Sequence, residues 1–305
     1  MFKGIALVFL GACSFGILST FVKLAYREGY TLGDVTGTQV FFGFVLLWSI
    51  VLLRRMFTKN TNRYTSTLTD KLKLVAMGTS TGLVSIFYYK CVQLVPASIA
   101  ILLLMQFTWV SLLLEAVIKR KLPGLSQVVM VLLVLLGTAL AGRLFSGSIP
   151  DFDWRGVGYG MLAAVCYSVF LLVSGAAGNN MHPTTKCALL LTGACILVLS
   201  IFPPVFLING SLFDGLLKWG LVLSVFGTVI PPLFFAYGIP RTGLGLSAIL
   251  SAAELPVAVV MSWVVLQEEV WPVQWLGVLL ILAAIALSNL GSVYQKRRLK
   301  KLTTA

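Results

Sequence analysis

Glu254 is the residue whose type and position most clearly suggest proton chemistry. It lies about ten residues into the apolar run Leu244–Leu266 and just before Pro256. An ionisable side chain deep in such a run is costly to keep and is therefore a functional candidate, and a proline disturbs the preceding helical turn and frees backbone carbonyls. Because burial favours the protonated form of a carboxyl group, Glu254 could exchange a proton near neutral pH. The alternative is a hydrogen-bonded Glu254 that only packs between helices.

Polar and aromatic side chains inside other apolar runs form a second group of candidates, for contact with a substrate. Each of them could instead form a hydrogen bond between helices. Lys90, near the end of its run, could bind a substrate carboxylate or extend its amine toward water. The substrate-contact candidates are Ser14, Gln39, Tyr89, Lys90, Gln106, Trp109, Tyr167 and Tyr237.

Two further charged residues near the ends of apolar runs have simpler interpretations. Lys23 is expected to extend its amine toward the interface. Glu115 stands four residues before Lys119, a spacing at which helical side chains form an ion pair. We therefore predict structural roles for both residues, and a functional role for Glu115 stays open.

Motifs for metal, nucleotide and covalent chemistry are missing from the sequence. There is no GxxxxGK[ST] loop, which argues against ATP hydrolysis by that route. The one histidine, His182, has no cluster of further metal ligands beside it. The five cysteines fall in apolar runs without a CxxC pair and are expected to pack as small apolar residues. We therefore predict no enzyme activity, no cofactor and no metal site.

The composition requires a lipid environment for most of the 305 residues. Hydrophobic residues make up 58% of the chain and charged residues 11%, whereas soluble proteins carry roughly a quarter charged residues. A helix needs about 20 mostly apolar residues to cross the hydrocarbon, and this criterion predicts ten spans. They are Gly4–Leu24, Val35–Leu53, Leu74–Leu94, Ala97–Ile118, Leu125–Gly142, Gly156–Ala176, Lys186–Ile208, Trp219–Tyr237, Leu244–Leu266 and Val273–Val293.

The distribution of basic residues predicts the orientation of these spans. If the N-terminus is cytoplasmic, most of the 23 Lys and Arg residues fall on the cytoplasmic side, in agreement with the positive-inside rule. Both termini are therefore predicted to be cytoplasmic, in a multi-pass protein of the inner or plasma membrane. The net charge of +13 is then explained by topology and by contact with anionic lipid headgroups, so no nucleic-acid partner is expected.

The two halves of the chain match each other at nearly constant offsets. A shift of 152 residues places Lys3-Gly4 on Arg155-Gly156, and a shift of 147 places the third to fifth spans on the eighth to tenth. Since five spans per half is an odd number, the second half enters the membrane inverted, as in many secondary transporters. We predict an all-α membrane protein with two inverted five-helix repeats (5+5), residues 1–147 and 148–295, and a basic cytoplasmic tail, 296–305. Chance similarity among hydrophobic helices is the alternative.

Prolines and glycines within the spans indicate where helices break and pack. Pro231-Pro232 is expected to break the eighth span, and Pro203-Pro204 to interrupt the seventh. The spacings Gly78-xxx-Gly82 and Gly156-xxx-Gly160 permit close approach of neighbouring helices.

The sequence resembles the drug/metabolite transporter superfamily, in particular its EamA-type members of two five-helix repeats. The resemblance covers nearly the whole chain and rests on Phe15-Gly16, Glu254-Leu-Pro256-Val, Glu268, Trp275-Leu-Gly277 and Ala283-Ala284. The first repeat departs from this pattern, because Trp109 aligns with Pro256 and Lys121 with Glu268. The resemblance implies a secondary carrier for small metabolites, with a central cavity between the first, third, fourth, sixth, eighth and ninth spans.

We therefore expect an alternating-access transporter, an exporter of amino acids or related metabolites, with proton coupling through Glu254 as a hypothesis. The export direction follows only from the resemblance. A flippase or scramblase for lipid-linked intermediates is an alternative in which Lys23 and Lys90 would bind the headgroup phosphate. A scaffold without transport activity is a third possibility. The sequence leaves the substrate, the coupling ion and the oligomeric state open.

Overall fold

The chain is mainly helical in the ranges that the computed structural model describes, which are residues 2–57, 66–95, 97–142, 153–267 and 269–303, and these ranges contain no β-strand. The α-helices are α1 (Phe2–Arg27), α2 (Leu32–Phe57), α3 (Leu68–Leu94), α4 (Ala97–Met105), α5 (Phe107–Lys119), α6 (Leu125–Ala141), α7 (Trp154–Ala176), α8 (Pro183–Ile201), α9 (Leu217–Leu223), α10 (Ile230–Thr242), α11 (Leu244–Ser251), α12 (Glu254–Leu266) and α13 (Pro272–Thr303). Three short segments accompany them: the 3₁₀ turn η1 (Val205–Leu207) and the π-helical segments η2 (Leu212–Leu216) and η3 (Ser224–Val229).

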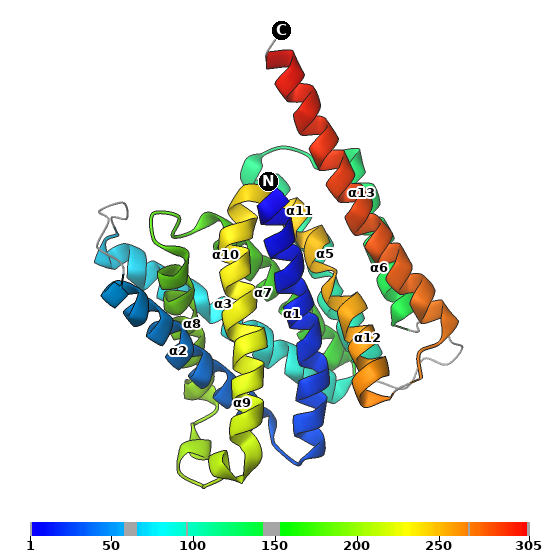
Figure 1. Cartoon of the computed structure of the whole chain (residues 1–305). Coiled ribbons are helices and arrows are strands. Elements are labelled where there is room, and N and C mark those ends of the chain that lie inside the picture. The colour runs from blue at the N-terminus through cyan, green and yellow to red at the C-terminus, as the bar shows by residue number, and fades with distance from the viewer. Residues whose placement is uncertain (1, 58–65, 96, 143–152, 268, 304–305) are drawn as a thin grey trace.

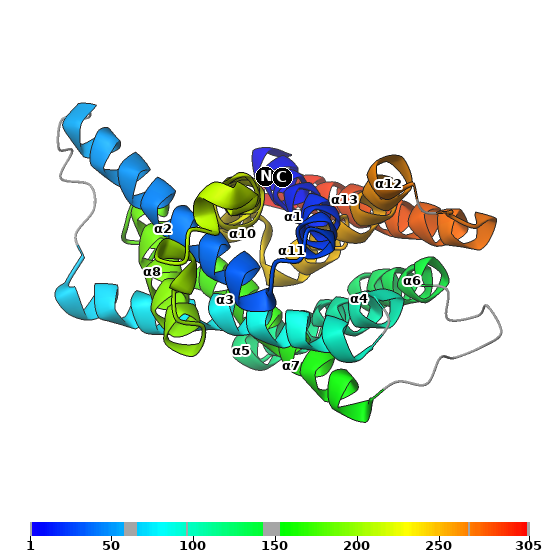
Figure 2. The ribbon, with the colours of Figure 1, turned by 90° about the horizontal axis from the view of Figure 1, so that it is seen from below.

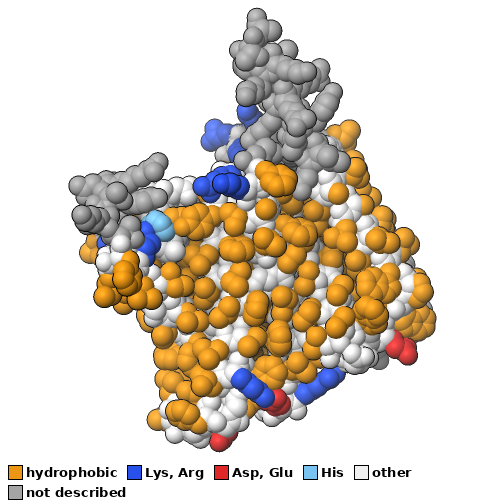
Figure 3. All heavy atoms as spheres, viewed as in Figure 1, with side chains coloured by type: hydrophobic (Ala, Val, Ile, Leu, Met, Phe, Trp, Pro, Cys, Tyr) orange, Lys and Arg blue, Asp and Glu red, His pale blue; other side chains and the backbone are white. Residues whose placement is uncertain are grey.

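Seven helical stretches among the described residues are long and apolar enough to cross a membrane. Helix α6 and the segment Pro272–Ser288 of α13 are shorter apolar helices, while α3 is long but carries Asp70, Lys71 and Lys73 near its start. Apolar side chains cover the middle of the face seen in Figure 3, and charged side chains lie at its upper and lower margins. The fold is that of a multi-pass membrane protein.

Four pairs of equivalent helices in the two halves begin at the offsets found in the sequence. Helix α1 begins at Phe2 and α7 at Trp154, 152 positions later, and α4, α5 and α6 begin 147 positions before α11, α12 and α13. The residues that end α5 and α12 in the left-handed conformation, Arg120 and Gln267, also stand 147 positions apart. Hydropathy alone does not fix the first residues of helices so closely, and their agreement supports an internal repeat.

Helices from the two halves pack crosswise. Helix α1 lies against α10 and α12, and α7, its counterpart, lies against α3 and α5. Phe2 and Thr303 lie at the same end of the bundle, which we call the N-terminal end; α1 finishes at Arg27 at the opposite end (Figure 1). Helices α6 and α13 pack against each other at one side.

Two membrane-length stretches are interrupted near their middles, at equivalent places. Helix α4 ends at Met105 and α5 begins at Phe107, while α11 ends at Ser251 and α12 begins at Glu254. Interrupted helices in membrane proteins are tolerated where their backbone is buried or lines a cavity. These breaks therefore mark the place where a site is expected.

The prolines end or distort helices at two further places. Pro231-Pro232 distort the eighth span and do not break it: the helical stretch Leu212–Thr242 continues through them, and π-helical η3 directly precedes α10, because proline has no backbone N–H to bond with the preceding turn. The predicted seventh span, extending to Ile208, was too long. Helix α8 ends at Ile201, since Pro203-Pro204 cannot continue it, and η1 follows.

Glycine allows α3 and α8 to approach each other at backbone distance. A Cβ atom added at Gly78 would overlap the backbone carbonyl of Leu190, and one at Gly193 would overlap that of Val75. Gly158 on α7 has open space around the corresponding position. The close α3–α8 contact therefore requires glycine at both Gly78 and Gly193.

An exposed carboxylate links the end of α1 to the start of α9 at the opposite end of the bundle. Glu28 accepts hydrogen bonds from Lys218 Nζ at 2.8 Å and from Trp219 Nε1 at 2.7 Å. These bonds, first from Lys218 and then from Trp219, hold the pKa of Glu28 below its usual value. A lowered pKa in the folded state means that the ionised carboxylate stabilises the fold.

We expect the stabilisation by Glu28 to be present at neutral pH and to disappear in acid. A depressed pKa contributes stability above the unfolded value of about 4 and loses it as the pH falls through the folded value. Thermal unfolding of wild type and Glu28→Gln in detergent should therefore differ at pH 7 and converge near pH 3. The same difference at both pH values would contradict this role, and Lys218→Met should remove most of it.

Candidate functional site

The break before α12 places Glu254 at the wall of an internal space. Glu254 is the first residue of α12 and is partly buried, and the hydroxyl of Tyr167 on α7 donates to its Oε2 at 3.5 Å. Helix α1 comes close here because residue 16 is glycine: an added Cβ at Gly16 would overlap the carbonyl oxygen of Glu254. The Phe15-Gly16 pair thus brings α1 against the start of α12.

Glu254 faces a cavity of about 760 Å³, within the roughly 300–1,000 Å³ range of small-molecule sites. Its walls come mainly from α1, α3, α4 and α12, and Figure 2 shows the arrangement of these helices from the opposite end of the bundle. It extends to the exposed residues Glu269 and Trp271. The cavity therefore reaches the surface at the end of the bundle where α1 and α12 finish.

An aromatic cluster packs beside Glu254. The Tyr167 ring lies 4.5 Å from that of Phe107 and 5.9 Å from that of Phe15, centroid to centroid. Phe235 lies 5.8 Å from Phe15 and 6.0 Å from Phe170. The rings come from α1, α5, α7 and α10, so aromatic packing joins both halves of the chain where the cavity ends at Phe15, Tyr167 and Phe170.

Four of the residues selected from the sequence line this cavity: Gln39, Tyr89, Tyr167 and Glu254. The Tyr89 hydroxyl donates to Gln39 Oε1 at 3.4 Å, which joins α3 to α2. The structure therefore places these four candidates, from α2, α3, α7 and α12, around one space.

Three other candidates are engaged within the helix packing and do not line the cavity. Ser14 donates to the carbonyl of Phe226 at 2.7 Å, a bond between α1 and η3. Trp109 Nε1 donates to Gln106 Oε1 at 2.8 Å, and Gln106 Nε2 donates to the carbonyl of Leu102 at 3.0 Å. Gln106 thus stands at the α4–α5 break with its amide bonded to residues of the same membrane-length stretch, and not to another span.

Lys90 and Tyr237 also lie away from the cavity-lining residues. Lys90 is exposed, and its Nζ donates to Gln93 Oε1 at 3.3 Å, in agreement with the extension toward water. The Tyr237 ring packs edge-on against His182, 6.3 Å between centroids. Glu268, part of the family resemblance, lies outside the described residues.

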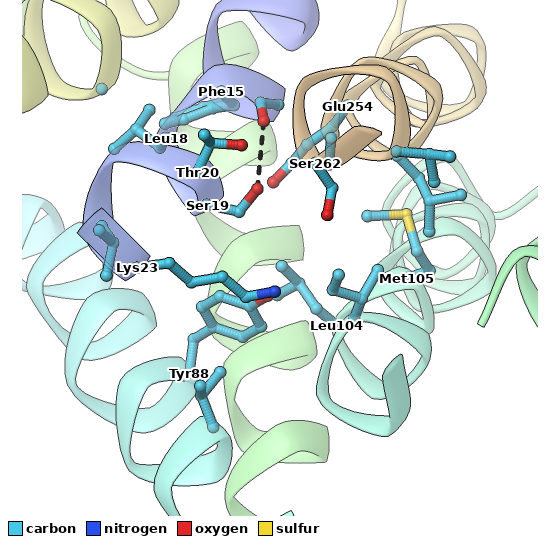
Figure 4. Close-up of a pocket in the computed structure, with 18 of the residues that line it drawn as sticks. Phe15, Leu18, Ser19, Thr20, Lys23, Tyr88, Leu104, Met105, Glu254 and Ser262 are labelled. Carbon is cyan, nitrogen blue, oxygen red and sulfur yellow. Dashed lines mark hydrogen bonds between the residues drawn. The ribbon is translucent and has the colours of Figure 1, made fainter. Parts of the chain in front are cut away.

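Lys23 is the cavity residue that the sequence interpretation missed. It was expected to extend toward the interface, but it lines the cavity, and Figure 4 shows its amine beside Tyr88, reaching into the space from α1. Ser19, Thr20 and Ser262 lie near Glu254 in the same view. The i, i+4 spacing of Ser19 and Lys23 puts them on one helix face, which was the available signal.

Glu115 forms its predicted ion pair with Lys119 and has a second partner. Its carboxylate also accepts the backbone N–H of Gly245, in the first turn of α11. This bond joins α5 of the first half to α11 of the second, near the N-terminal end of the bundle. The contact could not be inferred from the i, i+4 spacing.

Within the described ranges no three His, Cys, Asp or Glu residues are grouped so that they could hold a metal ion. All five cysteines are free thiols, and Cys91, Cys187 and Cys195 are buried. The polar groups on the cavity wall are suited to binding a small polar solute by charge and hydrogen bonding.

Known proteins resemble the chain over most of its length. The transporter sll1319 of Synechocystis sp. (strain ATCC 27184 / PCC 6803 / Kazusa), itself uncharacterised, is 25% identical over 95% of this chain and 94% of its own. The threonine/homoserine exporter RhtA of Escherichia coli (strain K12) is 27% identical over 76% of this chain and 75% of its own. A solved crystal structure covers 94% of this chain and 97% of its own with a TM-score of 0.75, at 16% identity, and therefore shares the fold.

The EamA-like transporter family matches residues 2–143 and 154–290. Each match covers one half, and the second begins at the residue where α7 begins. The chain belongs to the EamA-like transporter family.

Proposed function

We propose that the protein is a secondary-active exporter of amino acids or closely related metabolites. The observation that carries the proposal is a partly buried carboxyl group, Glu254, on the wall of a cavity that reaches the surface at one end of the bundle. A relative of similar length exports threonine and homoserine. Gln39, Tyr89 and Tyr167 would contact the substrate.

Proton coupling is assigned to Glu254 in this proposal. A carboxyl group on the cavity wall is reached by water when the cavity is open to one side, and by water from the other side after the helices rearrange. It can therefore load and release a proton in the two states of an alternating-access cycle.

The proposed architecture is ten transmembrane helices in two inverted five-helix repeats, residues 1–147 and 148–295, with both termini and the basic tail 296–305 in the cytoplasm. The matching helix bounds and crosswise packing support the repeat. The shared end of Phe2 and Thr303 supports an even number of crossings. In this orientation the N-terminal end meets the anionic headgroups of the cytoplasmic leaflet.

Transport by purified protein in proteoliposomes tests the function. We expect uptake of labelled L-threonine to be faster when the lumen is more acidic than the bath, because protons leaving the vesicle would drive amino acid inward. An equal uptake rate without the gradient would show that transport is not coupled to protons, while the proposed transport of amino acids would stand. No uptake of threonine, homoserine or other amino acids, together with dithionite bleaching of fluorescent lipids from both leaflets, would instead favour a lipid flippase or scramblase.

A further inference from the structure

The charged and hydroxyl groups of the cavity fall into two sets. Glu254 lies near the hydroxyl groups of Ser19, Thr20 and Ser262, whereas the amine of Lys23, one turn further along α1, lies beside Tyr88 (Figure 4). All of them line the same cavity. One part of the wall therefore offers a carboxylate with hydroxyl groups, and another offers an ammonium group.

The Ser19 hydroxyl of this set can form a further hydrogen bond. Ser19 donates to the carbonyl of Gly16 at 3.3 Å, which leaves its oxygen able to accept. The Thr20 hydroxyl is fully buried and is not reached from the cavity. Ser19 is therefore the hydroxyl group of α1 that can accept a further hydrogen bond from a ligand in the cavity.

We infer that Lys23 is the residue that binds the carboxylate of the substrate, while the ammonium group of the same molecule lies toward Glu254 and Ser19. The substrate class is then the free, unesterified amino acid, recognised at both of its charges. Leu104 and Met105 of α4 line the same cavity and would face the side chain. This inference rests on the proposed amino-acid transport.

The assignment follows from charge and from position. A lysine amine offers three donors and no acceptor, so it suits a carboxylate and repels an ammonium group. Among the lysines of the described residues, Lys23 lines this cavity and Lys90 does not. Glu269, the other carboxylate of the wall, is exposed at its mouth, where it would meet the substrate only on entry and exit.

Counterflow in proteoliposomes tests the inference, with labelled L-threonine outside and unlabelled L-threonine or its methyl ester inside. Wild type should exchange threonine in strong preference to the ester, which lacks the carboxylate charge. In Lys23→Gln the KM for threonine should rise about tenfold or more, the scale of one charge-assisted hydrogen bond. Exchange of the ester should stay nearly unchanged, so that the preference is lost.

Two variants separate recognition from folding. Lys23→Arg keeps the charge and should keep the preference for the free acid. Lys90→Gln removes an exposed lysine of the neighbouring helix and should exchange both compounds as wild type does. If Lys23→Gln keeps both its threonine KM and its preference, the inference is wrong while the proposed function stands. If wild type exchanges no amino acid at all, the proposed function fails and the inference with it.

Discussion

Replacing Glu254 with glutamine is expected to abolish the acceleration of transport by a pH gradient. Glutamine has the same shape and can still accept a hydrogen bond from Tyr167, which now lies 3.5 Å from the carboxylate, but it cannot load or release a proton. If Glu254 couples the proton flux to the amino-acid flux, uptake into acid-loaded proteoliposomes should fall at least about tenfold. A factor of this size lies within the roughly 5- to 150-fold range that is typical of coupling between two sites. Exchange without a gradient should fall by a smaller factor, because the amide still accepts hydrogen bonds.

The measurement is uptake of labelled L-threonine with and without an acidic lumen, for wild type and Glu254→Gln at equal reconstituted amounts. Glu28→Gln is the matched control, since Glu28 is exposed and outside the cavity lining. It should respond to the gradient as wild type does. Full gradient-driven uptake by Glu254→Gln would show that Glu254 is not the group that carries the coupled proton.

Gly78→Ala and Gly193→Ala are expected to destabilise the fold more than other substitutions of similar size. At each position the new methyl group would overlap a backbone carbonyl of the neighbouring helix, and a backbone cannot rotate away as a side chain can. Overpacking typically costs about 1–3 kcal/mol, and we expect the upper end here because α3 and α8 must separate. Both variants should show lower melting temperatures in detergent and lower membrane yields.

Gly158→Ala on α7 is the control, because nothing lies within 4 Å of the added methyl group. Alanine favours a helix over glycine by roughly 1 kcal/mol, so this variant should melt at or above the wild-type temperature. Equal melting of Gly78→Ala and wild type would mean that the two helices adjust without cost.

The helices and the central carboxyl group of Glu254 could be predicted because each appears as a pattern along the sequence. Long apolar runs give the helical stretches, and Glu254 beside Pro256 stands out in such a run. The offset of 147 residues indicated that α4–α6 and α11–α13 correspond, and the first residues of these helices agree with it.

The directions in which side chains point could not be predicted from the sequence. Lys23 and Lys90 both stand near the ends of apolar runs, and only the packing of α1 against its neighbours turns one into the cavity and leaves the other exposed. Lys186 begins the predicted seventh span, and it is buried and donates to the carbonyl of Ser174 at 2.8 Å. Such differences arise because helix rotation is set by contacts between distant residues.

The hydrogen bond from the backbone N–H of Gly245 to the Glu115 carboxylate affects the relative populations of the protein's conformational states. The residue 147 positions after Glu115 is Ser262, a neutral side chain on the cavity wall, so the opposite end has no carboxylate at the equivalent place. A hydrogen bond to a charged group contributes about 1.5–3 kcal/mol, which corresponds to a population ratio of roughly 10 to 150. In an alternating carrier the state closed at the N-terminal end would predominate at rest. A substrate arriving from that end would then bind with an apparent affinity reduced by the same ratio.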